Sequence, residues 1–210
     1  PVEYQLANIT QIQIQPEIGY TYAQGLRAIL RHDPDVVLIG EIRDLESAQI
    51  AIRAALTGHQ MFSTLHTNDA PQAVTRLLDM GRPFYQLQAA LNGILAQRLV
   101  RRLCPRCRRP DEGSLDALLD LGLRADQETF AGVGCPECNN IGYKGRVAVH
   151  ELLDFTPSLR RLRGDQINAE DIAHQAASEG AFFTMADSLR RKVLSGVTSV
   201  AEALELLHVD

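Results

Sequence analysis

The chain has 210 residues, which corresponds to one or two domains of about 150 residues each. Its residues are 45% hydrophobic and 22% charged, and no apolar run approaches the roughly 18 residues that cross a bilayer, so the composition disfavours intrinsic disorder and an integral membrane protein. The 26 acidic and 21 basic residues give a net charge of −5, so binding of nucleic acid along the whole chain is not expected. Nothing at the N-terminus resembles a signal peptide.

Strand and helix patterns alternate over residues 1–103, which is typical of an α/β domain with a largely parallel sheet. Ile12 and Ile14 alternate with glutamines and predict a half-exposed strand. Thr21 is placed to cap a helix. The unbroken apolar run Val36–Ile39 then predicts a strand that is buried on both faces.

The rest of this domain follows from capping residues and apolar spacing. Its expected elements are a helix capped by Asp44 and stopped by Gly58, a strand over Gln60–Leu65, a helix opened by Asp69 and Pro71, and a longer helix from Phe84 towards Leu103.

Four cysteines form two Cys-x-x-Cys pairs, Cys104 with Cys107 and Cys135 with Cys138. Two such knuckles supply the four sulfur ligands of a structural zinc site, with no position left for a catalytic water. Two disulfides are the alternative, but they need an oxidising compartment, and a thioredoxin-like redox site uses one such pair. The sequence therefore predicts a zinc module over 104–146, with an inserted helix around Ser114–Leu121.

Residues 147–210 predict one strand, over Val147–Leu153, followed by a small helical subdomain. Its helices are expected to begin near the capping residues Thr156, Asn168, Thr184 and Thr198.

Two chemically active side chains follow neighbouring strands of the predicted parallel sheet. Glu41 comes after Val36–Ile39, and His66 comes after Gln60–Leu65. Because the carboxyl ends of parallel strands meet at one edge of a sheet, both side chains are expected at the edge where such proteins bind ligands. A carboxylate there can order a Mg²⁺-bound or attacking water, and an imidazole can contact a terminal phosphate. The alternatives are a solvated or helix-capping glutamate and a structural histidine.

Longer motifs resemble those of the secretion ATPase superfamily that drives type II secretion and type IV pilus assembly. Gly25–Asp44 resembles its Walker B region, Thr57–Asn68 its His box, and Pro1–Tyr4 the end of its Asp box. Leu95–Arg101 and Gly142–Arg146 also follow the assembly and export branch, and the resemblance covers essentially the whole chain. Retraction motors generally lack the paired cysteines, so these point to assembly or export.

The resemblance implies an α/β fold: a partial RecA-like parallel-sheet ATPase core in 1–103, followed by the tetracysteine zinc module and the helical subdomain. It further implies a cytoplasmic homo-hexamer that uses ATP and Mg²⁺, carries Zn²⁺, and is peripherally associated with the inner membrane. Its partners would be platform proteins of the secretion or pilus machine, and no nucleic acid is expected.

Individual roles follow from the same resemblance. Glu41 would be the Walker B carboxylate that acts on Mg²⁺ and the attacking water, and Glu3 would be the last acid of the Asp box. His66, and with it His59, would sense phosphate. Three arginines of the Walker B region would contact phosphate or a neighbouring subunit, unless they lie on a solvated helix face or pair with nearby acids: Arg27, Arg31 and Arg43.

No GxxxxGK[ST] phosphate-binding loop occurs, since the only lysines are Lys144 and Lys192. The chain is therefore expected to be a C-terminal fragment that begins after the P-loop half and does not turn over ATP alone. Two other functions stay open. One is a zinc-containing nucleic-acid-binding module, favoured by arginines around the first cysteine pair but opposed by the scarcity of aromatic residues there. The other is an adaptor that has lost catalysis.

Overall fold

The computed structural model describes residues 2–111, 114–162 and 167–208, and the chain divides into two compact units. The first comprises Pro1–Ile94 and Asp154–Ser178, and the second comprises Leu95–Leu153 and Glu179–Asp210. The expected helical subdomain over 147–210 is thus divided, since part of it packs with the first unit and part with the cysteine-containing unit. No helix among the described residues is both long and apolar enough to span a bilayer.

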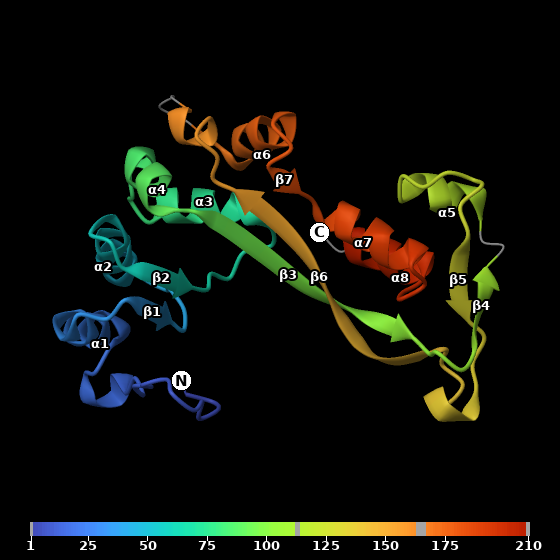
Figure 1. Ribbon diagram of the computed structural model, residues 1–210, viewed down its shortest axis with the longest axis horizontal. Helices are drawn as coiled ribbons and strands as arrows, with labels where there is room; N and C mark the ends of the chain where they lie inside the picture. Colours follow the sequence, from blue (N-terminus) through green and yellow to red (C-terminus); the bar gives the residue numbers. More distant parts are fainter. Residues whose placement is uncertain (1, 112–113, 163–166, 209–210) are drawn as a thin grey trace. The chain divides into compact units, whose positions relative to one another are not determined.

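The first unit is an α/β arrangement whose helices begin largely where their caps predict. Its elements are η1 (Pro16–Ile18), α1 (Tyr22–Ile29), η2 (Leu30–His32), β1 (Val36–Ile39), α2 (Leu45–Leu56), β2 (Gln60–Ser63), α3 (Ala70–Asp79), α4 (Phe84–Ala90), η4 (Leu159–Arg161) and α6 (Ala169–Ser178) (Figure 1). The side chains of Thr21, Asp44 and Asp69 each accept a backbone N–H from the first turn of α1, α2 and α3. These three helix starts are confirmed.

Strands β1 and β2 pair in parallel, from Val36 opposite Gln60 to Ile39 opposite Ser63. Val37 and Ile39 are buried against Leu26 of α1 and Ala51 of α2. Their neighbours on the strand point the other way, and Leu38 is 73% exposed. The expectation of a strand buried on both faces is therefore wrong for the described residues, because helices pack against only one face.

Two further predicted elements are wrong. The segment with Ile12 and Ile14 forms no strand. The long helix predicted from Phe84 towards Leu103 ends at Ala90, and an eleven-residue strand, β3 (Gly93–Leu103), takes its place. Its leucine, alanine, glutamine and arginine residues favour helix, but pairing with a distant strand overrides that local preference.

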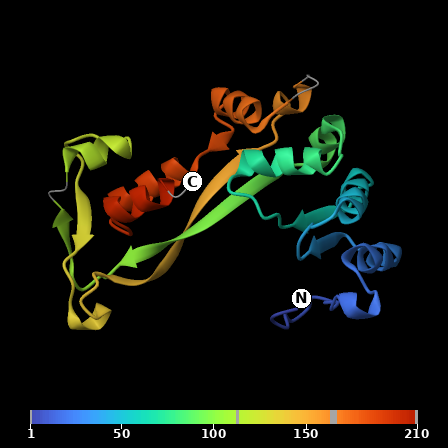
Figure 2. The same ribbon diagram turned by 180° about the vertical axis from the view of Figure 1, so that it is seen from behind.

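The second unit contains most of β3 and the following elements: β4 (Arg108–Asp111), α5 (Leu115–Asp120), β5 (Thr129–Gly132), η3 (Pro136–Cys138), β6 (Tyr143–Asp154), β7 (Phe182–Phe183), α7 (Met185–Leu194) and α8 (Val200–Leu207). Strands β3, β6 and β7 form one sheet in that order, and β4 pairs antiparallel with β5. Helices α7 and α8 lie beside the long β3–β6 ribbon, as the two opposite views in Figures 1 and 2 show.

The core of this unit joins its sheet to its helices. Val100 of β3 and Val149 of β6 pack with Leu118 of α5 and with Leu189 and Val193 of α7. The inserted helix predicted around 114–121 is confirmed, as is the Thr184 cap of α7, whereas α8 is capped by Ser199 and not by Thr198. The inserted helix therefore contributes to the core.

Candidate functional site

The loops that follow β1 and β2 are fastened to each other beyond the ends of the strands. The Ile42 N–H donates to the Thr64 carbonyl oxygen over 3.0 Å, and the Thr64 hydroxyl donates to the Gly40 carbonyl oxygen over 2.6 Å. These bonds extend the parallel pairing by one step. They place Glu41 and His66 together at the edge of the sheet.

The Glu41 carboxylate is held by two basic side chains. The Arg43 guanidinium lies 2.6 Å from Oε1, and His66 Nε2 lies 3.1 Å from Oε2. The Glu41 side chain is only 10% exposed, whereas those of Arg43 and His66 are 68% and 86% exposed. The hydrogen bond from Arg43 lowers the pKa of Glu41 most strongly, partial burial opposes it, and His66 lowers the pKa further. Glu41 is therefore a carboxylate at neutral pH.

A cavity of about 330 Å³ adjoins His66 and is walled by the loop after β2 and one face of α3. Its lining is polar and consists of His66, Thr67, Asn68, Gln72, Thr75, Arg76 and Asp79. The cavity offers space for a polar ligand beside the imidazole.

Two predicted site residues lie apart from Glu41. His59 sits at the opposite end of β2 from His66, with its ring Nδ1 3.1 Å from the Ala54 carbonyl oxygen at the end of α2. Glu3 is exposed in an irregular segment and forms no ion pair with any residue that the structure describes. The structure thus brings His66, but not His59 or Glu3, into bonding contact with Glu41.

The three predicted arginines differ in their surroundings. Arg43 binds Glu41, as described, and Arg27 at the end of α1 forms an ion pair with Glu46 at the start of α2. Arg31 is exposed and has no ion pair within the described ranges. Of the three, only Arg31 is without a carboxylate partner there.

The four cysteines converge in the second unit, with all of their sulfur atoms within 4.8 Å of one another. The Sγ atoms of Cys104 and Cys135 are 3.8 Å apart, as are those of Cys107 and Cys138, and all four thiols are free. A tetrahedral zinc ion bound at about 2.3 Å requires sulfur–sulfur separations of about 3.8 Å. The four sulfurs therefore fit a zinc ion. They are not joined as two disulfides, which was the alternative that the sequence left open.

Backbone donors surround one of these sulfurs. The N–H groups of Cys135 and Gly142 each lie 3.3 Å from Cys138 Sγ. Burial raises the pKa of Cys138, but these and neighbouring thiol hydrogen bonds outweigh it and lower the pKa to about 6. Burial instead raises the pKa of Cys107 to about 12. The thiolate, which is the metal-binding form, is thus favoured at Cys138.

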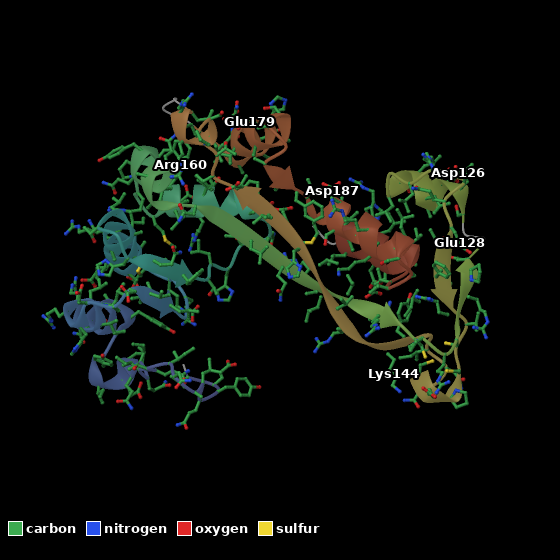
Figure 3. The ribbon with its side chains drawn as sticks, viewed as in Figure 1. Asp126, Glu128, Lys144, Arg160, Glu179 and Asp187 are labelled. Carbon is green, nitrogen blue, oxygen red and sulfur yellow. The ribbon has the colours of Figure 1, made fainter. Side chains whose placement is uncertain are left out.

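Glycines allow the backbones to cross tightly beside the second cysteine pair. A Cβ atom on Gly132 would lie 2.2 Å from the Gly142 carbonyl oxygen, and one on Gly142 would lie 2.4 Å from the Gly132 oxygen. Figure 3 shows Lys144, two residues further along, beside the gathered sulfur atoms. Both glycines are structural requirements of the cysteine cluster. Gly142 stands in a motif that the sequence already marked, whereas Gly132 was missed, although its position ahead of the second pair is a signal.

Three of the basic residues around the cluster have acidic partners within the chain. Arg106 and Lys144 both pair with Glu137. Arg101 binds Glu202 of α8 through its backbone N–H and its guanidinium. The guanidinium carbon of Arg101 also lies 4.3 Å from the centre of the Tyr143 ring. These pairs reduce the positive charge that a nucleic-acid surface would need.

Comparison with known proteins places this architecture in a family. Residues 1–205 match the family described as type II/IV secretion system protein. The chain belongs to that family. The "Type IV pilus assembly ATPase PilB" of Pseudomonas aeruginosa is 46% identical over 96% of this chain and 36% of its own length. The "Type II secretion system ATPase E" of Vibrio cholerae is 45% identical over 98% of this chain and 41% of its own length. The chain therefore spans about two-fifths of the length of these type II/IV secretion relatives.

Solved structures share the fold of this type II/IV secretion protein. The pilus retraction motor PilT, crystallised with ADP, superimposes with a TM-score of 0.60 and 30% identity, covering 89% of this chain and 43% of that protein. The Legionella pneumophila ATPase DotB superimposes with a TM-score of 0.61 at 21% identity, covering 89% of this chain and 42% of DotB, a likeness of fold alone. The α/β fold, with both parallel and antiparallel sheets, is thus that of secretion ATPases.

Proposed function

We propose that this chain belongs to a hexameric cytoplasmic ATPase that powers type II secretion or type IV pilus assembly at the inner membrane, in contact with platform proteins there. The observation that carries the proposal is the contact of Glu41 with His66 at the carboxyl edge of two parallel strands, in a family whose relatives are named as ATPases. This is the edge at which α/β folds bind their ligands.

Glu41 is proposed as the residue that orients the attacking water and supports Mg²⁺. Its charge suits both tasks, because an ionised carboxylate accepts hydrogen bonds from water and is a hard oxygen ligand. The His66 imidazole contacts this carboxylate and also lines the polar cavity, so it can contact the terminal phosphate of bound ATP. Mg²⁺ would supply charge neutralisation of the phosphates when bound.

Glu3 and Arg31 are proposed to act in the assembled protein. Both are exposed, and neither has an ion pair among the described residues, so each is available to the nucleotide or to a neighbouring subunit. Arg27 forms an ion pair with Glu46, and the His59 ring contacts the Ala54 carbonyl oxygen at the end of α2. These contacts favour structural roles for both residues.

The cysteine cluster is proposed to hold a structural Zn²⁺. Its four sulfurs match the spacing of a tetrahedral site. They would fill all four positions around the ion, so no position is left for a catalytic water. It would therefore stabilise the second unit without taking part in hydrolysis.

A chimera tests the proposed activity, because the sequence of this chain contains no phosphate-binding loop. The chain replaces the stretch of the P. aeruginosa PilB relative that aligns with it, and phosphate release from ATP is measured. We expect hydrolysis by the chimera, none by the chain alone, and a loss of at least about a hundredfold with Glu41→Gln. Glu128→Gln, the same change at an exposed glutamate of the second unit, should leave the rate unchanged.

Two results would contradict the proposal. Full hydrolysis by the Glu41→Gln chimera would remove Glu41 from the mechanism. A folded, hexameric chimera that binds but never hydrolyses ATP would favour the adaptor alternative.

A further inference from the structure

Both oxygens of the Glu41 carboxylate are occupied, and by different elements. His66 approaches Oε2 from the loop after β2, whereas Arg43 approaches Oε1 from the same loop as Glu41 itself. Arg43 is the closer partner, at 2.6 Å against 3.1 Å for His66. The position of the carboxylate therefore depends first on Arg43.

The backbone explains why Arg43 reaches this carboxylate. Ile42 packs against the core of the first unit, and its N–H is bonded to the loop after β2. Glu41 and Arg43 flank Ile42 on either side, and their side chains meet within this short segment. Asp44 then caps α2, which fixes the far end of this short segment.

We infer that Arg43 is the positioning residue of the Glu41 carboxylate, rather than a contact for phosphate or for a neighbouring subunit. This inference rests on the proposed function of Glu41. The Arg43 guanidinium binds Oε1 and His66 binds Oε2, so the two contacts together restrict the carboxylate in rotation as well as in place, and the shorter, always charged contact is that of Arg43. Arg43 thereby directs the second oxygen, Oε2, toward His66 and the cavity beyond it.

Few other charged groups act on this pair. The groups that affect Glu41 are Arg43 and His66, and the Tyr22 hydroxyl of α1 adds a small electrostatic effect on Arg43. The ion pair raises the pKa of Arg43 and lowers that of Glu41, so both stay charged through the neutral range. Loss of the arginine should therefore raise the pKa of the carboxyl, because the largest influence favouring its charged form is gone.

The first experiment measures the pKa of Glu41 directly in the 210-residue chain, by carboxyl-carbon NMR, with Glu41→Gln identifying the signal. We expect Arg43→Gln to raise this pKa and Arg43→Lys to restore part of the difference, because lysine keeps the charge but not the fork. The matched control is Arg124→Gln, which removes an arginine that lowers the pKa of its own partner, Asp126. It should raise the pKa of Asp126 and leave that of Glu41 unchanged.

The second experiment follows hydrolysis against pH in the PilB chimera. If only the ionised Glu41 is active, the rate falls as the pH drops through the Glu41 pKa, so Arg43→Gln should move this acidic fall to higher pH. We also expect kcat to fall by on the order of a hundredfold with KM within about twofold, as for a misplaced catalytic group. Arg124→Gln should change neither the profile nor kcat.

The outcomes separate the two proposals. An unchanged Glu41 pKa in Arg43→Gln overturns the positioning role, whatever the chimera does. A KM that rises while kcat and the pH profile stay unchanged also overturns it, because that result identifies a substrate contact. A raised pKa in a chain whose wild-type chimera does not hydrolyse ATP supports the Arg43–Glu41 contact and contradicts the proposed function alone.

Discussion

The two units of this chain are stabilised in different ways. In the first, the β1–β2 sheet buries Val37 and Ile39 on one face and exposes Leu38 on the other, and the edge that carries Glu41 depends on a few polar contacts. In the second, a sheet and three helices surround one apolar core, and four convergent thiols form a separate buried cluster. The edge proposed to bind the nucleotide thus lies on a sheet that helices cover on one face only, whereas the second unit is held by an enclosed apolar core and by its cysteine cluster.

Metal removal should destabilise the second unit more than any other change considered, and it should leave the first unit unaffected. Stripping zinc from the purified chain with a chelator is expected to unfold the cysteine knuckles and expose α8, because structural zinc contributes on the order of 10 kcal/mol to folding. Arg101 binds Glu202 of α8, and Arg108 donates to the Gly196 carbonyl oxygen in the segment before α8. The loss of structure should therefore spread from the knuckles to α8 through these two contacts. Hydrogen exchange measured by mass spectrometry should rise in the second unit.

The first unit is the internal control for that experiment. Exchange in α1, α2 and β1 should stay the same within error after chelation, since none of their residues belongs to the cysteine cluster. Equal loss of protection in both units, or a chain that holds no zinc when purified, would contradict the proposed metal role.

Gly132→Ala is expected to have the next largest effect. The added methyl would lie 2.2 Å from the Gly142 carbonyl oxygen, and backbone on both sides leaves little room to relax. We expect the free energy of unfolding of the second unit to fall by about 3 kcal/mol, with weaker zinc retention. Urea unfolding and bound zinc per chain measure the two effects.

Gly145→Ala provides the matched comparison. Gly145 also lies beside the cluster, but a Cβ there meets no atom within 4 Å, and only its positive φ of 76° opposes the change. The expected cost is about 1 kcal/mol, with full zinc occupancy. Because Gly132, unlike Gly145, has no positive φ, similar losses for the two variants would mean that the backbone relaxes around the added methyl and that the close approach does not make Gly132 necessary.

Topology made the contact between Glu41 and His66 predictable from the sequence. The neighbourhood of Glu41 and His66 follows from two parallel strands, because their carboxyl ends must share an edge. The convergence of the four cysteines was likewise predictable, because two Cys-x-x-Cys pairs are typical of one shared metal site. The roles of these residues in hydrolysis stay predictions.

Features set by distant pairing were not predictable in the same way. Helix-favouring residues in Gly93–Leu103 conceal a strand, since its partner β6 begins forty residues further on. The opposed backbones of Gly132 and Gly142 are also visible only once the chain has crossed itself. Arg43 was one of three similar arginines in the sequence, and only the folded loop distinguishes it as the partner of Glu41.

The smallest expected effect comes from the exposed face of β1, and it tests the contrast within one strand. Leu38→Thr should change the free energy of unfolding by no more than about 0.5 kcal/mol, because Leu38 is 73% exposed and threonine suits a strand. Val37→Thr, one residue away, puts a hydroxyl into the core and should cost about 2 kcal/mol. Urea unfolding of the first unit, followed by hydrogen exchange of α1 and α2, measures both. Equal losses would mean that Leu38 is covered in solution, and sedimentation of wild type against Leu38→Thr would then reveal whether a second copy covers it. A clear difference would establish that helices support this sheet from one side only, so that the position of Glu41 depends on the single buried face beneath β1.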